Sequence, residues 1–288
     1  MVAVVAGALV VVIVGAILGY KFAGSGGTTK VSAANAAPAD VVAAATHLSA
    51  ADLTKAGLGS PGSVFPPRPI KGGQPPLTKD GKPEVLYMGA EYCPYCAATR
   101  WPLVVALSRF GTFSGLKATH SSSTDVYPNT ATFSFYGSSY RSKYLSFVPV
   151  EMNKNKAVNG NYPTLQVPTK QQSALLAKYD SPPYVPQADQ DGIPFIDFAN
   201  RYLLSGTLYD PQVLQGLSMG TIAGSLSLPT SPQGRAIDAS ANYLTATICE
   251  VTHNRPASVC SSSVVAKAEA ALNKAHAAGK SSKAKSGK

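Results

Sequence analysis

The tetrapeptide Cys93-Pro94-Tyr95-Cys96, with the residues on either side of it, constrains the fold of this chain more than any other stretch. The apolar run at residues 85–90 predicts a strand that is covered on both faces. Residues 97–110 have helical character, and Pro102 within them should kink the helix. The two cysteines therefore stand where a buried strand passes into the first turn of a helix.

A cysteine at the start of a helix has a specific chemistry. The first backbone N–H groups of a helix have no partner within it, and the helix dipole is positive there, so a thiolate is favoured. The thiolate is the form of cysteine that attacks disulfides. We therefore expect Cys93 to be the nucleophile and Cys96, one turn further on, to be the resolving thiol. Pro94 supports a helix start, because the N–H that proline lacks would be unpaired there anyway.

The motif and a second segment far downstream resemble the thioredoxin superfamily. Cys93-Pro94-Tyr95-Cys96 is the tetrapeptide found in glutaredoxins, and residues 192–206 resemble the superfamily's cis-proline loop and the hairpin after it. The resemblance implies that Pro194 faces the dithiol and that the backbone of Ile193 pairs with the substrate chain. It also implies an α/β, thioredoxin-like three-layer fold, with an insertion at residues 152–191 before the cis-proline loop.

A closer resemblance covers most of the chain. Residues 84–260, and especially 108–130, are similar to an actinobacterial and archaeal family of membrane-anchored, thioredoxin-like proteins of unknown function. This resemblance brings no assigned substrate.

The chain departs from the superfamily pattern just before the motif. Many thioredoxins place a buried aspartate six residues before the first cysteine as a proton relay, and that position is Tyr87 here. Glu91 is a candidate substitute, although a carboxylate so close to the thiol would raise its pKa. Tyr95, with Pro94, influences the redox potential without fixing its value. Glutathione-binding signatures beyond the tetrapeptide are not evident, so glutaredoxin activity does not follow.

The other two cysteines, Cys249 and Cys260, are separated by ten residues. We predict a structural disulfide, which would contribute about 3 kcal/mol for a loop of this length. A metal pair is the alternative, but no second Cys-x-x-Cys or His-x-x-x-His spacing accompanies them. His120, which ends an expected strand, suggests a metal site with the dithiol, but no convincing third ligand is present. We therefore expect neither a metal nor another cofactor.

The N-terminus predicts a transmembrane anchor at residues 1–20. Residues 2–19 carry no charge, and about 18 residues just span a hydrocarbon layer of ~27–30 Å. A cleaved signal peptide is the alternative, but the apolar run is longer than is typical and no charged segment precedes it. Lys21 weakly opposes an outside C-terminus. Paired cysteines are typical of an oxidising compartment, so we place the domain on the extracytoplasmic side of a single-pass cell-membrane protein.

The sequence divides into four segments. They are a membrane anchor at 1–20, a flexible and proline-rich linker with one short helix at 21–76, a thioredoxin-like domain at 77–262, and a basic disordered tail at 263–288. The tail holds six lysines against one glutamate, which is half of the net charge of +10. Lysines in a solvated tail are usually only solvating, so we expect no nucleic-acid partner.

The remaining elements are predicted from local patterns. The linker helix should cover residues 40–58 with Asp40 as its N-cap, and Gly111 should end the helix that follows the motif. A strand is expected at residues 115–123, and alternating aromatic residues predict a hairpin at 132–150 that turns at Gly137. Further helices are expected at residues 169–179, 212–219 and 234–249.

These features predict a membrane-anchored, extracytoplasmic thiol–disulfide oxidoreductase. It would exchange disulfides with protein substrates through Cys93 and Cys96, and a membrane redox partner would recharge the dithiol. The alternative is a non-catalytic binding or scaffold protein whose dithiol senses redox state or binds a metal. The presence of both cysteines and of Pro194 favours the first hypothesis. The sequence leaves the direction of exchange open between oxidase, reductase and isomerase.

Overall fold

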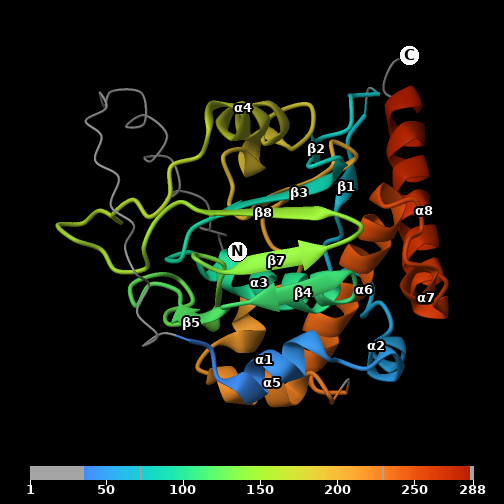
Figure 1. Cartoon of the computed structure of the whole chain (residues 1–288). Coiled ribbons are helices and arrows are strands. Elements are labelled where there is room, and N and C mark those ends of the chain that lie inside the picture. The colour runs from blue at the N-terminus through green and yellow to red at the C-terminus, as the bar shows by residue number, and fades with distance from the viewer. Residues whose placement is uncertain (1–35, 72, 229, 286–288) are drawn as a thin grey trace, which may run out of the picture. The chain divides into compact units, whose positions relative to one another are not determined.

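The computed structural model of the chain describes residues 36–71, 73–228 and 230–285, with side chains as far as Lys274. This part of the chain is a mixed α/β structure with a central sheet (Figure 1). The predicted anchor at residues 1–20 lies outside the described residues. Within the described ranges, no helix combines the length and the apolar character needed to cross a membrane.

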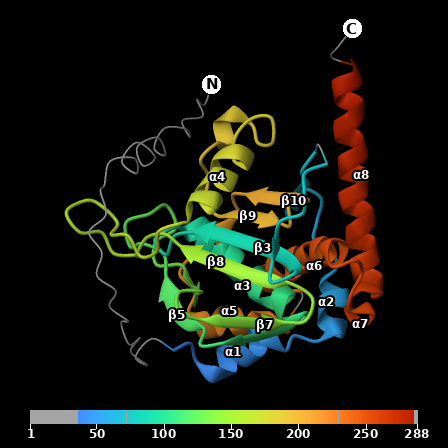
Figure 2. The same cartoon turned by 45° about the horizontal axis from the view of Figure 1, so that its top comes forward.

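The central sheet is built around β3, the strand that leads to the dithiol (Figure 2). Its neighbours are β9, which is antiparallel, and β8, which is parallel. β3 is buried from Glu84 to Gly89, as the apolar run predicts. The strands of this sheet are β1 (Arg68–Pro69), β2 (Thr78–Lys79), β3 (Lys82–Gly89), β8 (Ser146–Glu151), β9 (Phe195–Phe198) and β10 (Tyr202–Ser205).

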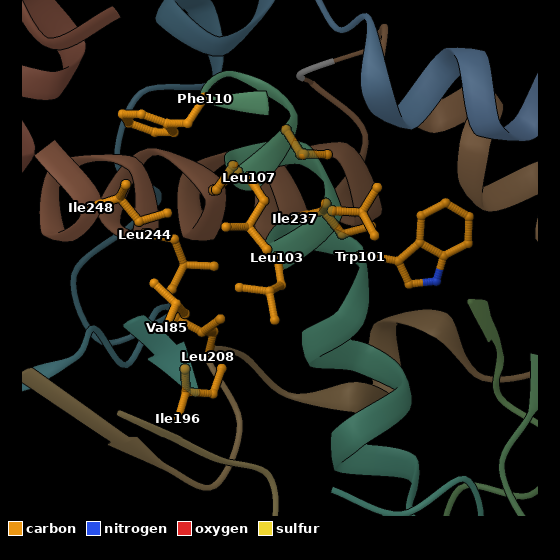
Figure 3. Packing of buried hydrophobic residues seen from close by; sticks show 14 of the residues in the cluster. Val85, Trp101, Leu103, Leu107, Phe110, Ile196, Leu208, Ile237, Leu244 and Ile248 are labelled. Carbon is orange, nitrogen blue, oxygen red and sulfur yellow. The ribbon is translucent and has the colours of Figure 1, made fainter. Parts of the chain in front are cut away.

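One face of the sheet is covered by α3 (Pro94–Ser108) and α6 (Pro232–Val251). Figure 3 shows Leu103 and Leu107 of α3 packed with Leu244 of α6, and all three are fully buried. Each such side chain contributes about 1.5–3 kcal/mol by leaving water. Because α3 is buried on nearly all sides, it is the central helix of the domain, and its first turn is held firmly.

The opposite face of the sheet is covered by α4 (Lys170–Tyr179), so the predicted helix at residues 169–179 is present. Thr169 caps it in a reciprocal capping box with Gln172. Apolar side chains from the sheet and from the segment around α4 form a second buried cluster, which comprises Leu77, Leu86, Met88, Val150, Tyr179, Val185, Phe195 and Leu203. The segment at residues 152–191 therefore covers the sheet as well as connecting β8 to β9.

The expected strand at 115–123 is present as β5, but the expected hairpin at 132–150 is wrong. The structure forms two small antiparallel sheets, in which the two strands that flank Gly137 pair with the two strands that flank Gly115 and not with each other. Positive φ angles at Gly115 and Gly137 divide the two runs. The alternation of aromatic and polar residues along a strand predicts which face of the sheet each side chain takes, but it does not predict which strand is the neighbour. The sheets pair β4 (Gly111–Ser114) with β7 (Ser139–Ser142) and β5 (Lys117–His120) with β6 (Ala131–Ser134).

Gly111 does not end α3. The helix ends at Ser108, and Gly111 is the first residue of β4. A Cβ atom added to Gly111 would lie 2.3 Å from the carbonyl oxygen of Arg141. The glycine is therefore required by the close approach of β7 and not by a helix cap.

Two predicted helices are each divided in the structure. The expected helix at residues 40–58 is α1 (Ala39–Thr46) and α2 (Ala50–Ala56), because the Ser49 side chain accepts a bond from the Asp52 N–H and starts a new helix. Asp40 is not an N-cap, since Pro38 takes that position. Similarly, residues 212–219 are divided at Gly216, which has a positive φ. They contribute to a short 3-10 helix, η4 (Pro211–Leu214), and to α5 (Met219–Ser225).

The predicted disordered tail at residues 263–288 is also wrong, because Ser263–Lys285 forms the helix α8. Val264, Val265, Ala268 and Leu272 are buried, and α8 contacts α6. Their helical spacing gives α8 an apolar face that outweighs the solvating effect of the lysines. The domain also includes α1 and α2, whose Val41 and Leu53 join the same core. Its extent is therefore wider than the predicted 77–262.

Candidate functional site

The two cysteines of the motif lie at the first turn of α3. Cys93 is the N-cap, and its Sγ accepts a hydrogen bond from the Cys96 backbone N–H at 3.2 Å. Pro94 occupies the first helical position, as predicted. Neither cysteine is in a disulfide in this structure, so the site is in its dithiol form.

The loop before β9 meets the dithiol. Cys93 Sγ lies 3.6 Å from the carbonyl oxygen of Ile193, to which the thiol donates a hydrogen bond. Pro194 follows Ile193 through a cis peptide bond and leads directly into β9. The structure thus brings together two segments that are 100 residues apart in the sequence.

Burial changes the acid–base chemistry expected of Cys93. The side chain is only 4% exposed, and burial raises the pKa of its thiol well above the usual range. The neighbouring Cys96 adds to this rise, while the Cys96 N–H and Arg100 act in the opposite direction. The backbone N–H donor expected at a helix N-terminus is therefore present. Burial raises the pKa of the Cys93 thiol by more than this donor lowers it, so the thiolate is not favoured.

A buried ion pair lies next to the dithiol. Arg100, one turn after Cys96 on α3, donates from Nε and Nη2 to the two carboxylate oxygens of Glu151 at 2.8 and 2.6 Å. Nη2 also donates to the carbonyl oxygen of Ala90 at 2.9 Å. Neither side chain of the pair is exposed. Sequence reasoning missed both residues, and the only available signal was the i,i+4 spacing of Cys96 and Arg100 on one helix face.

Tyr87 is also fully buried. A Cβ atom added to Gly89 would lie 2.3 Å from Tyr87 Oη and 3.1 Å from Cys96 Sγ, so the hydroxyl and the sulfur both adjoin this glycine. Burial raises the pKa of Tyr87 well above its usual value. The hydroxyl is therefore a neutral donor, and it has no hydrogen-bond partner within the described part of the chain.

Aromatic side chains attach two loops to the turn that holds Cys93 and Cys96. The rings of Tyr92 and Tyr162 are stacked at 4.2 Å, and Tyr162 Oη donates to Ser122 Oγ at 2.7 Å. The Ser122 N–H in turn donates to the carbonyl oxygen of Tyr92. Tyr95, the most exposed residue of the motif, makes an edge contact with Tyr127. Tyr162 belongs to the segment at 152–191, which thus borders the dithiol.

The other candidate residues take structural positions. The Glu91 carboxylate accepts a bond from Ser134 Oγ, and its backbone N–H donates to Asn153 O. His120 is exposed and bonds the adjacent carbonyl of Ser121. Among the described residues, no group of three His, Cys, Asp or Glu side chains is placed to hold a metal.

Cys249 and Cys260 are joined by a disulfide. The bond connects the last turn of α6 to α7 (Ala257–Cys260), the short helix that precedes α8. These sulfurs are therefore in their oxidised form, while those of Cys93 and Cys96 are free.

Comparison with known proteins gives one match. The profile of a family described as a domain of unknown function (DUF929) matches residues 69–250, which include β3, the dithiol, the loop before β9 and most of α6. No curated protein and no solved structure matches the chain.

Proposed function

The chain belongs to the family described as a domain of unknown function (DUF929), and from the chemistry of its site we propose that it is a thiol–disulfide oxidoreductase acting on proteins through Cys93 and Cys96. The observation that carries the proposal is the Cys93 thiol at the start of α3, 3.6 Å from the carbonyl oxygen of Ile193. A client chain that pairs with the Ile193 backbone would present its own sulfur to Cys93.

The proposal includes a thioredoxin-like fold. Three features support it: a central β3 between parallel β8 and antiparallel β9, helices on both faces of the sheet, and a cis proline beside a Cys-x-x-Cys helix start. In this interpretation residues 152–191 are an insertion before the cis-proline loop.

The exchange proceeds in two balanced steps. The Cys93 thiolate attacks one sulfur of a client disulfide, a mixed disulfide forms, and the other client sulfur leaves and takes up a proton. Cys96 then attacks Cys93 Sγ, the bond to the client breaks, and the second client sulfur leaves as a thiol. The client gains two electrons, and Cys93 and Cys96 become a disulfide. The reverse sequence oxidises a client dithiol.

The environment of Cys93 favours the reducing direction. A dithiol is a strong oxidant when its reduced form is stabilised as a thiolate. Burial raises the pKa of Cys93, so the reduced form lacks that stabilisation here. We therefore expect a midpoint potential closer to about −270 mV than to about −120 mV.

A reductant must be recharged, so the proposal includes an electron-donating membrane partner. It also places the domain on the extracytoplasmic side, tethered by the apolar residues 1–20, because the disulfide of Cys249 and Cys260 is typical of an oxidising compartment. The scaffold alternative is favoured by one observation, the low exposure of Cys93. In that case the dithiol would respond to small oxidants without turning over protein clients.

The test is a redox titration of the purified full chain in dithiothreitol buffers of defined potential, with trapping by an alkylating reagent and peptide mapping. We expect a reversible two-electron transition of Cys93 and Cys96, while the peptides of Cys249 and Cys260 remain unlabelled. Cys93→Ala is the control that abolishes the transition. A pair that never cycles, or that cycles without reducing insulin as a model protein disulfide, contradicts the proposal.

A further inference from the structure

We propose that Tyr87 and Arg100 stabilise negative charge on the sulfur of Cys96 while it resolves the mixed disulfide, and that Glu151 is a positioning residue that holds Arg100 in place. The inference rests on the proposed function and concerns its second step.

The guanidinium of Arg100 is held so that one donor remains free. Glu151 is bound through Nε and Nη2, which form one side of the planar group. Nη1 is at the opposite corner, is buried, and has no partner among the described residues. An unpaired buried donor on a charged group is costly, so its presence on a side chain one turn after Cys96 requires an explanation.

The Tyr87 hydroxyl is the second free donor at this site. Its ring lies 5.9 Å from the Arg100 Cζ atom, and its oxygen adjoins Gly89 together with Cys96 Sγ. Gly89 leaves room for this approach, because any side chain there would overlap both groups. Tyr87 Oη therefore adjoins Cys96 Sγ beside Gly89, and Arg100 is near enough for its charge to act on the same sulfur.

The titratable groups facing this sulfur come from three places. They are Tyr87 on β3, Glu151 at the end of β8, and Tyr92, Cys93 and Arg100 in the active-site turn and α3. Arg100 is the only cation in this set. Burial lowers the pKa of the guanidinium, but Glu151, Tyr87 and Cys96 together outweigh burial and hold that pKa above its usual range. Its positive charge is therefore permanent.

In the resolving step the Cys96 S–H loses its proton to water, and Cys96 Sγ attacks Cys93 Sγ. The bond between Cys93 and the client breaks, and the departing client thiolate takes up a proton from water. Negative charge passes through Cys96 Sγ at the start of this step. The Tyr87 O–H donates to that sulfur and keeps its own proton, and the Arg100 charge acts at short range in a medium of low dielectric.

The experiment isolates the resolving step. The full chain is mixed rapidly with excess Ellman's reagent at each pH, and Cys93 attacks the reagent in a first phase that becomes faster with reagent concentration and leaves thionitrobenzoate bound to Cys93. Attack of Cys96 on Cys93 then releases this thionitrobenzoate in a second phase whose rate does not depend on reagent concentration. The measured quantity is the rate of release by Cys96 as a function of pH.

Tyr87→Phe removes only the hydroxyl. We expect release near neutral pH to slow by about 10- to 100-fold, the equivalent of one hydrogen bond to a charged group, and the pH profile to move upward. Glu151→Gln should act in the opposite direction and move the profile downward, because it leaves the charge of Arg100 uncompensated. A structural role alone would move the melting temperature and not the profile.

Tyr209→Phe is the matched control. Tyr209 is also fully buried, and its hydroxyl donates to the Ala98 carbonyl of the same helix α3. Its loss should leave the pH profile unchanged. If the Tyr87→Phe profile superimposes on that of the wild type, or if Tyr209→Phe shifts it equally, the inference is overturned while the proposed function stands. If the wild type itself releases no thionitrobenzoate in the second phase, both fail. Should Glu151→Gln not fold, Tyr87→Phe decides alone.

Discussion

Gly89→Ala tests the packing beside the dithiol directly. The new Cβ would lie 2.3 Å from Tyr87 Oη, 2.7 Å from Tyr87 Cζ and 3.1 Å from Cys96 Sγ. All three separations are shorter than ordinary van der Waals contact, so the tyrosine and the cysteine must move apart. Gly89 does not have a positive φ, so the cost is one of overpacking rather than of backbone strain. Overpacking of a buried site costs about 1–3 kcal/mol.

The assay is urea unfolding of the full chain, with unchanged slope and a lower midpoint as the expected result. Gly224→Ala is the control of opposite sign, since this residue lies in α5 and a Cβ there meets nothing within 4 Å. It should stabilise the chain by about 0.5–1 kcal/mol. Adding Tyr87→Phe to Gly89→Ala removes the shortest contact, so the double variant should lose less stability than the two single losses together. An unchanged midpoint for Gly89→Ala would refute the reasoning.

Two further predictions concern the rest of the domain. Replacing Cys249 and Cys260 by alanine should lower the free energy of unfolding by about 3 kcal/mol, because the unfolded chain gains the entropy of an open loop. The redox transition of Cys93 and Cys96 should stay unchanged. A shifted midpoint potential would instead show that the two pairs exchange electrons. Burial, with Asp52 nearby, raises the pKa of Asp238 to about 8, so the folded state keeps a proton that the unfolded chain loses near pH 4. Stability should therefore fall as pH rises from about 4 to about 8, and Asp238→Asn should flatten this slope in melting curves; a slope identical to the wild type's would exclude Asp238 as its cause.

Local signals in the sequence predicted the elements that carry the dithiol. The apolar run became β3, Pro94 marks the start of α3, and residues 195–206 form the β9–β10 hairpin. Each of these depends on neighbouring residues alone. They fix the position of Cys93 at the end of a strand and the start of a helix.

The contacts that surround the dithiol depend on residues far apart in the sequence. Arg100 and Glu151 are separated by 51 positions, and nothing near either residue announces a buried pair. The sequence drew attention to Tyr87, but the approach of Tyr87 to Cys96 depends on how β3 packs over α3. The thiolate expected for Cys93 was inferred from the helix end alone, and burial, which the sequence does not state, opposes it.

At the C-terminus, composition predicted a disordered tail where the structure has the helix α8. Lysines and alanines at residues 263–288 suggested a solvated tail, yet four apolar side chains at helical spacing bury one face of α8. A search for periodicity within that segment would have found them, because Val264, Ala268 and Leu272 recur every four residues.

The pairing of both β8 and β9 with β3 has a consequence for how relatives of this chain can diverge in length. The segment between these strands begins and ends at positions fixed by the ladder of β3, so residues added within it do not change the distance between Cys93 and Ile193. The entropy of closing a longer loop rises only slowly with its length. Insertions and deletions are therefore expected to collect at residues 154–161, before Tyr162, whose ring stacks on Tyr92. A single inserted residue between Tyr87 and Gly89 would instead turn every following side chain of β3 to the opposite face.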